Sequence, residues 1–485
     1  MTGLINRSEQ KEILTAFRRA LSQERHNLLE RPEILWQQMY NRLQWMDGKN
    51  KDGPVSQIIA PEFKKRTAPG SKPWFHNKCK TKDAQALSLV LEGHNSWITS
   101  CIFSPDGQLL ATSANDFTIR LWNVHTGSEL AVLEGHTNLI NTYAFSPDSK
   151  TLVSSGHDST IRLWDVVTGD QRAVLKSKDC LIKPPYAFSP DSKTLASAAD
   201  DKTIRLWDVV SGRERTILTD HSDRVISCSF SPNGKILATA GNDQTVRLWD
   251  VHKGAEQAVL KGHKDWVNSC IFSPDGRILA SAGDDETVRL WNPYARIFKK
   301  KAVLKGHCFE IVFCTFSPDG KILATVGRDK TVLLWNVSTG KVRAVLDGGT
   351  IALDLMADYS SGPGACKFSP DSKALISTGG GNSFRLWDVA TGKGRVFINC
   401  RTGLIEACAF SPDGQVLATA SGIMDKTIRL WDVAKGKLID TYPCLEAVKN
   451  CSFSPTDWII ATGDPRGNVY ILKLYNIDFQ MSKEV

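Results

Sequence analysis

Leu260 to Ala302 reads LKGHKDWVNSCIFSPDGRILASAGDDETVRLWNPYARIFKKKA, and this stretch decides the fold. Three short runs, 266–272, 278–281 and 287–291, are rich in β-branched and aromatic side chains and are bounded by turn formers, so we predict three strands. Ser273-Pro274-Asp275-Gly276 between the first two runs suits a type I turn, because Pro274 presets φ at the second position. The stretch is therefore predicted to form a small antiparallel sheet.

The chain repeats this pattern nine times. A four-stranded sheet with two apolar faces must pack on neighbouring copies, and a spacing of about 42 residues is typical of β-propeller blades. We therefore predict an all-β propeller of nine four-stranded blades. Each copy has a Phe followed by Ser-Pro, at Phe103, Phe145, Phe188, Phe230, Phe272, Phe316, Phe368, Phe410 and Phe453. A large side chain follows 19 residues later, or 21 in one copy, at Trp122, Trp164, Trp207, Trp249, Trp291, Trp335, Trp387, Trp431 and Leu472.

The repeats resemble the WD-repeat β-propeller family over residues 88–474. The structural signature of that family is a hydrogen-bonded set of His, Ser or Thr, Asp and Trp inside each blade. Such a set satisfies buried polar groups that would otherwise cost about 1–3 kcal/mol each. The resemblance implies the complete set in five copies: His94, Thr112, Asp116 and Trp122; His136, Ser154, Asp158 and Trp164; His221, Thr239, Asp243 and Trp249; His263, Ser281, Asp285 and Trp291; and His307, Thr325, Asp329 and Trp335.

Four copies lack part of the set. We expect these blades to be locally less rigid, because a strand that begins at Pro184-Pro185 loses ladder donors and the internal network is incomplete. The differences are Asp179 for the His of the third copy; Tyr359 and Gly381 for the His and Asp of the seventh; Arg401 for the His of the eighth, with Gly422-Ile423-Met424 inserted; and Cys444, Arg466 and Leu472 for the His, Asp and Trp of the ninth.

The ends of the repeat array predict how the ring closes. Ser88–Leu91 matches the fourth strand of other copies, such as Ala131–Leu133, and the ninth copy ends at its third strand, Asn468–Leu472. The start of the first copy is therefore expected to supply the missing outer strand of the last, which removes a free sheet edge. Because nine blades exceed the usual four to eight, an eight-bladed ring with one displaced unit is an alternative.

Residues 1–48, ahead of the repeats, are predicted to form a helical hairpin. Ser8 can cap the first helix, Pro32 can begin the second, and Gly48 can end it. The hairpin resembles the helical element that precedes WD-repeat arrays in bacterial signalling proteins with a NACHT or NB-ARC nucleotide-binding domain. The residues that carry this resemblance are Ala20-Leu21, His26, Leu28, Pro32, Leu35, Gln38 and Arg42-Leu43. Residues 49–87 are predicted to be a basic irregular linker, and 475–485 a C-terminal tail.

Charge and cysteine usage limit the class of protein. Residues 1–87 hold 16 Lys and Arg against 9 Asp and Glu, a net +7 that leaves +1 for the rest of the chain, so the propeller is not predicted to bind nucleic acid or a membrane surface. Neither an apolar run of membrane-spanning length nor a secretory signal is present, and we expect a cytoplasmic protein. Seven cysteines lie two residues before the repeat Phe and are predicted to be core side chains rather than disulfides.

No catalytic constellation and no phosphate-binding Gly-x-x-x-x-Gly-Lys-Ser/Thr motif occur, so we predict no enzyme, no cofactor and no metal site. The favoured function is a monomeric protein-interaction scaffold. The alternatives are a sensor or regulatory subunit that works with a signalling NTPase or effector, and RNA or anionic-surface binding through the basic linker. WD-repeat proteins usually bind partners at the channel rim on one face. The equivalent positions here are Trp97, Leu139, Arg224, Trp266, Glu310 and Leu404, with His157, Arg328 and Met424 from a second set.

Overall fold

The computed structural model describes residues 87–175, 182–294, 300–347, 366–379, 383–399, 405–422, 425–444 and 446–474. The predicted helical hairpin (1–48), nearly all of the predicted linker (49–87) and the predicted tail (475–485) lie outside these ranges. Residues Leu89–Leu472 form one compact unit.

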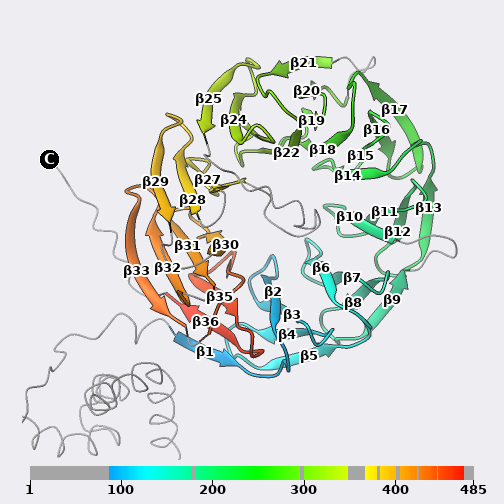
Figure 1. Cartoon of the computed structure of the whole chain (residues 1–485). Helices are drawn as coiled ribbons and strands as arrows, with labels where there is room; N and C mark the ends of the chain where they lie inside the picture. Colours follow the sequence, from blue (N-terminus) through cyan, green and yellow to red (C-terminus); the bar gives the residue numbers. More distant parts are fainter. Residues whose placement is uncertain are drawn as a thin grey trace, which may run out of the picture. The chain divides into compact units, whose positions relative to one another are not determined.

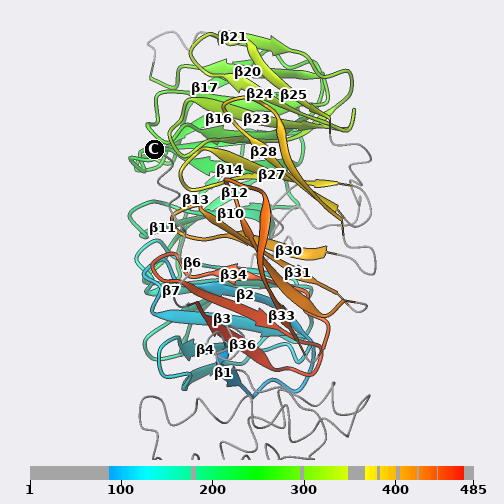
Figure 2. The same cartoon turned by 90° about the vertical axis from the view of Figure 1, so that its left-hand side faces the viewer.

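Within the described residues, 36 strands form nine four-stranded sheets arranged around a common centre (Figure 1). The prediction of a nine-bladed all-β propeller is confirmed, and the eight-bladed alternative is wrong. Viewed from the side, the sheets lie face to face in a stack (Figure 2). This arrangement follows from the sequence, because each sheet carries apolar side chains on both faces and needs a neighbour on each.

Each blade has the same strand order from the centre outward (Figure 1). The innermost strands are β2 (Ile98–Phe103), β6 (Ile140–Phe145), β10 (Ile182–Phe188), β14 (Val225–Phe230), β18 (Val267–Phe272), β22 (Ile311–Phe316), β26 (Cys366–Phe368), β30 (Ile405–Phe410) and β34 (Ser452–Phe453). The second strands are β3 (Leu109–Ala114), β7 (Thr151–Gly156), β11 (Thr194–Ala199), β15 (Ile236–Gly241), β19 (Leu279–Gly283), β23 (Ile322–Gly327), β27 (Ala374–Gly379), β31 (Val416–Ser421) and β35 (Ile459–Gly463).

The third strands contain the repeat Trp, or Leu472 in the ninth blade, and the fourth strands form the perimeter. The third strands are β4 (Ile119–Asn123), β8 (Ile161–Asp165), β12 (Ile204–Asp208), β16 (Thr245–Asp250), β20 (Thr287–Trp291), β24 (Thr331–Asn336), β28 (Ser383–Asp388), β32 (Thr427–Asp432) and β36 (Val469–Lys473). The outer strands are β5 (Glu129–Leu133), β9 (Gln171–Leu175), β13 (Glu214–Leu218), β17 (Ala255–Lys261), β21 (Lys300–Lys305), β25 (Val342–Asp347), β29 (Gly394–Asn399), β33 (Lys437–Pro443) and β1 (Leu87–Leu91).

The ninth blade takes its outer strand from the beginning of the described chain. Its strand order is β1-β36-β35-β34, so Leu87–Leu91 lies beside Val469–Lys473. The amide of Ile98 in the first blade also donates to the carbonyl of Asp464 in the ninth at 3.1 Å. One buried cluster contains Trp122 together with Ile459 and neighbouring side chains of both blades. The first and last blades therefore share a strand connection and a core.

The hydrophobic core lies between adjacent blades. Between the fourth and fifth blades, Val246 and Leu248 pack with Phe272 and Trp291, all less than one tenth exposed. Ala238 and Ala240 on β15 belong to the same cluster, and these small side chains let the two sheets approach. Burying one large side chain contributes about 1.5–3 kcal/mol, so the repeat Phe and Trp supply much of the stability of each junction.

The Ser-Pro-Asp-Gly segments form tight turns at the ends of the innermost strands. Ser273 Oγ donates to Asp275 Oδ1 at 2.6 Å and accepts from the amide of Ile278 at 3.0 Å, and Gly276 has a φ of 72°. This left-handed conformation suits glycine because a side chain would be strained there. The turn thus connects β18 to its antiparallel neighbour β19.

The third blade shows how a proline pair fits into an innermost strand. In β10, Lys183 pairs with Ala198, and the next paired residue is Tyr186, opposite Ser197. Pro184 and Pro185 therefore occupy a β-bulge, where no ladder donor is needed. The expectation that this strand begins at Pro184-Pro185 is wrong, because β10 extends from Ile182 to Phe188.

Candidate protein-binding rim

Five blades contain a buried chain of hydrogen bonds. In the second blade, Trp164 Nε1 donates to Ser154 Oγ at 2.8 Å, and Ser154 Oγ lies 2.8 Å from His136 Nε2. His136 Nδ1 lies 2.9 Å from Asp158 Oδ2. Contacts of 2.7–2.9 Å join the equivalent atoms of His94, Thr112, Asp116 and Trp122; His221, Thr239, Asp243 and Trp249; His263, Ser281, Asp285 and Trp291; and His307, Thr325, Asp329 and Trp335.

The two ends of this chain set the direction of every hydrogen bond in it. An indole N–H only donates and an ionised carboxylate only accepts, so Ser154 donates to a neutral His136 whose proton is on Nδ1. Burial lowers the pKa of His136, against the opposing influence of Asp158. Burial by itself would raise the pKa of Asp243, but hydrogen bonds from His221 and Thr245 outweigh it and hold this pKa at about 2. All the hydrogen-bonding groups of the set are thus used within the blade.

Three of the four blades with an incomplete set keep the Trp contact, and the ninth has Leu472 in place of the Trp. Trp207 donates to Ser197 at 2.8 Å, and Trp387 donates to Ser377 at 2.8 Å. Trp431 donates to Thr419 at 3.0 Å.

The ninth blade places a carboxylate by a different route. Asp464, which is 1% exposed, accepts from the Tyr470 hydroxyl at 2.8 Å and from the Arg466 amide at 2.8 Å. The repeat spacing places Arg466 at the Asp position of the other blades. Asp464 holds the turn position that Gly156 has in the second blade, because the Asp464 amide donates to the Asn468 carbonyl at 3.0 Å just as the Gly156 amide donates to Thr160 at 3.2 Å. The carboxylate therefore lies two residues earlier in a turn of the same length.

The two sets of predicted rim residues lie at neighbouring positions of each blade. One set immediately precedes the innermost strand, and the other immediately precedes the Asp of the hydrogen-bonded set. A backbone hydrogen bond joins the two positions. The bonds run from the amide of Asn115 to the carbonyl of Trp97 (2.9 Å), His157 to Leu139 (2.8 Å), Asn242 to Arg224 (2.9 Å), Asp284 to Trp266 (2.8 Å) and Arg328 to Glu310 (2.9 Å).

Most of these rim side chains are exposed. Trp97 is 44% exposed and Trp266 is 48% exposed, although most of the tryptophans that the structure describes are buried. Leu139, Arg224, His157 and Arg328 are also exposed, and Glu310 is half-buried. Leu404 and Met424 lie outside the described residues. The rim therefore presents large apolar and cationic side chains on a fixed backbone, which are the types that anchor interfaces.

Three further residues extend this rim and were not singled out from the sequence. Phe309 is 58% exposed, one position before Glu310. Phe117 is 37% exposed and has a φ of 67°, the conformation that the equivalent turn residue also has in other blades, such as Gln244 at 64° and Lys330 at 67°. Lys449 Nζ lies 4.5 Å above the centre of the Trp97 ring. Phe309 and Phe117 could have been recognised as aromatic residues beside the aligned rim positions.

The rim carries charges of opposite sign in different blades. Beside Trp266, burial raises the pKa of Asp284, and the nearby charges of Glu310 and Asp265 add to the effect. Beside Trp97, the ninth blade contributes Lys449, and Glu446 forms ion pairs with Lys426 and Arg466. The part of the rim around Trp266 is therefore acidic, whereas the part around Trp97 carries a cation.

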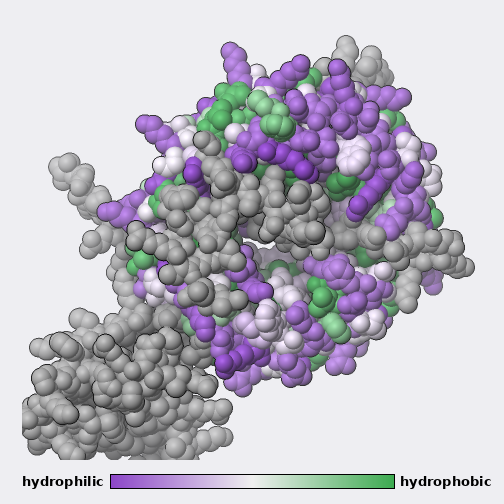
Figure 3. Space-filling view, in the orientation of Figure 1, coloured by the Kyte–Doolittle hydropathy of each residue, from purple (hydrophilic) through white to green (hydrophobic). Residues whose placement is uncertain are grey.

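A cavity of about 920 Å³ lies at the centre of the ring, below the rim. Its polar lining includes Ser100, Thr142 and Asn450, and its charged lining includes Lys367 and Glu406. The space-filling view shows a mostly hydrophilic face with an opening at its middle (Figure 3). Among the described residues, no group of His, Cys, Asp or Glu side chains is arranged to hold a metal ion. Likewise, no helix in the described ranges is long and apolar enough to cross a membrane.

Comparison with family models agrees with the blade architecture. The model described as WD domain, G-beta repeat, matches residues 85–123, 127–165, 358–388 and 394–432. The model described as the IFT122 first beta-propeller matches residues 185–355.

Similar proteins share only part of their length with this chain. The chain is 31% identical over 104 residues to WD repeat-containing protein 90 of Mus musculus, covering 21% of this chain and 6% of that protein. It is 29% identical over 125 residues to small ribosomal subunit protein RACK1y of Oryza sativa subsp. japonica, covering 24% of this chain and 37% of that protein.

A solved structure supports the fold alone. The crystal structure of the computationally designed Ika8 protein superposes with a TM-score of 0.51 at 24% identity, over 80% of this chain and 99% of that chain.

Proposed function

Because this chain belongs to the WD40-repeat β-propeller family, we propose that it is a non-enzymatic protein-interaction scaffold that binds its partners at the rim. The observation that carries this proposal is the exposure of Trp97 and Trp266 at positions held by cross-strand backbone hydrogen bonds. A rigid, exposed Trp loses little conformational entropy on binding and buries a large area, so it anchors interfaces well.

The charge distribution around the two tryptophans supports a partner with two kinds of contact. Asp284, whose amide donates to the Trp266 carbonyl at 2.8 Å, lies near Asp265 and Glu310, with Arg328 as the nearby cation. The carboxylates outnumber the cation, so basic side chains of the partner fit there. Lys449 lies against Trp97, which favours an acidic or carbonyl-bearing segment on that side. We propose that one polypeptide partner contacts both regions.

The experiment compares rim and opposite-face variants. A chain with Trp97→Ala, Arg224→Ala and Trp266→Ala is compared with wild type for capture of binding proteins, identified by quantitative mass spectrometry. The matched control is Val167→Ala with Val210→Ala, because these side chains are 84% and 74% exposed in turns at the other end of their blades. We expect the rim variant to lose specific partners while its melting temperature is unchanged. Equal capture by all three proteins would refute the proposal.

A second candidate function rests on the hairpin pattern of residues 1–48. We propose that, if this segment binds a separately encoded signalling NTPase or effector, the chain acts as its regulatory subunit. Deleting residues 1–48 is then expected to release that enzyme while the rim partners stay bound. Retention of the enzyme by the shortened chain would exclude this role.

A further inference from the structure

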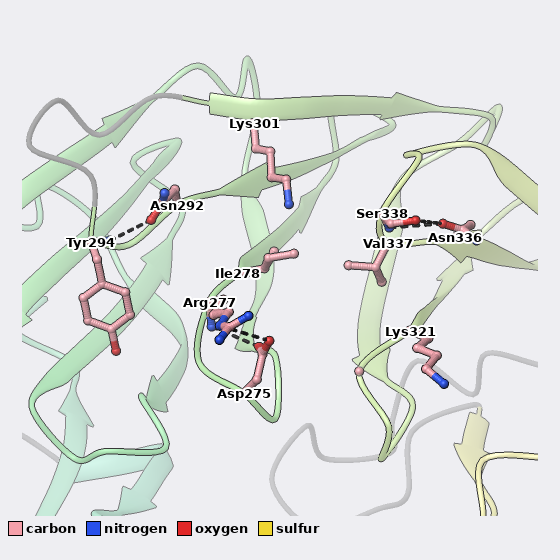
Figure 4. Close-up of a pocket in the computed structure, with 11 residues that line it drawn as sticks. Asp275, Arg277, Ile278, Asn292, Tyr294, Lys301, Lys321, Asn336, Val337 and Ser338 are labelled. Carbon is pink, nitrogen blue, oxygen red and sulfur yellow. Dashed lines mark hydrogen bonds and ion pairs between the residues drawn. The ribbon is translucent and has the colours of Figure 1, made fainter.

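The fifth and sixth blades form a pocket of about 570 Å³ at the end of the blades opposite the rim (Figure 4). Trp266 precedes β18, and the Ser273–Gly276 turn follows it, so roughly 20 Å of strand separates the rim from this pocket. Ile278 and Val337 supply apolar lining, and the Tyr294 ring stands at one side (Figure 4). The pocket is therefore distinct from the proposed protein-binding rim.

Cations outnumber carboxylates in the lining of this pocket. Arg277, Lys301 and Lys321 line it with Asp275 as the one carboxylate. Asp275 Oδ1 accepts hydrogen bonds from the Ser273 hydroxyl at 2.6 Å and the Arg277 amide at 3.0 Å. This carboxylate therefore stabilises the Ser273–Gly276 turn. Its ion pair with Arg277 is long, at 3.9 Å, and exposed to solvent. Lys321 likewise pairs with Asp319 at 3.7 Å, again between exposed side chains. Such exposed pairs contribute little, so Arg277 and Lys321 are available to a ligand.

In other blades, a cation at the position of Lys301 pairs with an acid that follows the repeat Trp. In the second blade, Arg172 on the outer strand pairs with Asp165, the residue after the repeat Trp, at 2.5 Å. In the seventh blade, Arg395 pairs with Asp388 in the same way. Lys301 occupies the position of Arg172 in the fifth blade, but the acid is replaced by Asn292. The described residues place no carboxylate in ion-pair contact with Lys301, whose side chain extends from β21 toward the space between Ile278 and Val337 (Figure 4).

The same replacement occurs in the sixth blade, where Asn336 also lines the pocket. Both asparagines preserve the turn, because Asn292 Oδ1 accepts from the Tyr294 amide at 3.0 Å and Asn336 Oδ1 from the Ser338 amide at 3.1 Å. Asp165 makes the equivalent contact with the Val167 amide at 2.8 Å. Turn geometry thus accepts either residue. The asparagines in two adjacent blades leave this pocket without two negative charges, whereas the third such asparagine, Asn123, lies in the first blade.

We propose that this pocket binds a phosphate group through Lys301, Arg277 and Lys321. The surplus of positive charge matches a phosphate monoester, which carries a charge of about −1.5 to −2 at pH 7. Arg and Lys are the side chains that usually donate hydrogen bonds to phosphate oxygens. The apolar lining and Tyr294 suit a ligand that is more than a bare anion. A phosphorylated side chain of a peptide and free phosphate share this chemistry, and the test separates them.

The decisive variant is Asn292→Asp, which keeps the turn and restores the carboxylate that five other blades have. Three probes are titrated into the full chain by calorimetry at low salt: a phosphoserine peptide, its unphosphorylated twin and inorganic phosphate. We expect saturable binding of a phosphate-bearing probe, weakened at least about fivefold by Asn292→Asp, the factor for one carboxylate about 4 Å from the anion in water. Lys301→Gln is expected to weaken binding as well.

The matched control is Asn123→Asp, the same substitution in the first blade, where Asn123 Oδ1 accepts from the His125 amide at 3.0 Å outside the pocket. This variant and the rim variant are expected to bind like wild type. Tighter binding of the phosphopeptide than of phosphate identifies a peptide ligand, and the reverse identifies the free anion. Equal affinity of the Asn292→Asp and Asn123→Asp variants, or no saturable binding of either phosphate-bearing probe, would overturn the proposal.

Discussion

At the scale of single residues, the histidine of each complete set lies between a hydroxyl that donates to it and a carboxylate that accepts from it. Protonating this ring adds a second donor at Nε2, which faces the hydroxyl proton, so the hydrogen-bond chain is lost. The Asp and His of these sets therefore stabilise the blade and are unsuited to proton transfer with a substrate. The titration of His136 and Asp158, whose pKa values are both lowered in the folded blade, is expected to appear in the unfolding free energy.

The first prediction concerns pH. The pKa of His136 is lowered from the ordinary 6.5 by burial, so its contribution to stability is present above pH 6.5 and is lost as the pH falls through its folded pKa. The pKa of Asp158 is about 2, below the ordinary 3.8, which adds a second loss in stronger acid. Urea midpoints measured across this range should fall in both windows. In a His136→Asn variant, the fall of the urea midpoint in the window at higher pH should be smaller. A wild-type midpoint that does not change above pH 4 would contradict the role assigned to His136 in the hydrogen-bonded set.

The second prediction concerns cysteine reactivity. Burial raises the pKa of Cys314 to about 11, whereas Cys308 is exposed on the rim side of the sixth blade. Because the thiolate is the nucleophile, iodoacetamide should modify Cys308 much faster than Cys314 in the native protein. Peptide mass spectrometry gives both rates in one experiment, with a urea-denatured sample as control. Similar native rates would show that the innermost strands are open to solvent.

At the scale of elements, the turns both end strands and connect blades. Ser149, Ser192 and Ser372 replace the turn glycine and have φ angles of 61–62°. Each hydroxyl accepts from an amide in the preceding blade, such as Asp106 at 3.2 Å for Ser149. The strain of the left-handed conformation is thus offset by a contact that glycine cannot make.

The third prediction follows from this balance. Ser149→Gly removes both the strain and the contact, so its effect on the unfolding free energy should be small. Ser149→Ala keeps the strain and loses the contact, so it should be less stable than the Gly variant by about 1 kcal/mol. Chemical denaturation of the three proteins measures the difference. An alanine variant as stable as the glycine variant would show that the turn is not strained.

The strands, turns and blade number could be predicted from the sequence because each repeat has the same apolar periodicity and turn residues. Features that depend on a single blade departing from the repeat pattern could not be predicted from the sequence. The bulge at Pro184-Pro185 needs the pairing register, and the role of Asp464 needs the contacts that its side chain makes with Tyr470. The rim positions of Trp97 and Trp266 came from family resemblance, whereas the exposure of Phe309 depends on how its loop turns the ring to solvent.

At the scale of the whole molecule, the ring depends on one connection between the two ends of the repeat array. Leu91 on β1 is 3% exposed and packs in the cluster shared by the ninth and first blades. Without β1, the ninth blade would have a three-stranded sheet with an open edge at β36. The rim and the phosphate pocket both rely on this closure, since they are built from side chains of adjacent blades.

The fourth prediction concerns this connection. Leu91→Ala removes a buried side chain at the junction and should cost about 2–5 kcal/mol. The loss should be local at first, because each blade contacts mainly its two neighbours. Leu130→Ala is the matched control, since Leu130 is 51% exposed on the neighbouring outer strand β5.

Amide hydrogen exchange of the Leu91→Ala variant tests ring closure most directly. The account predicts faster exchange in Val469–Lys473 and Ile98–Phe103, on either side of the junction, with no change in the fourth and fifth blades, and no effect of Leu130→Ala. Unchanged exchange in Val469–Lys473 would contradict a ring closed by β1.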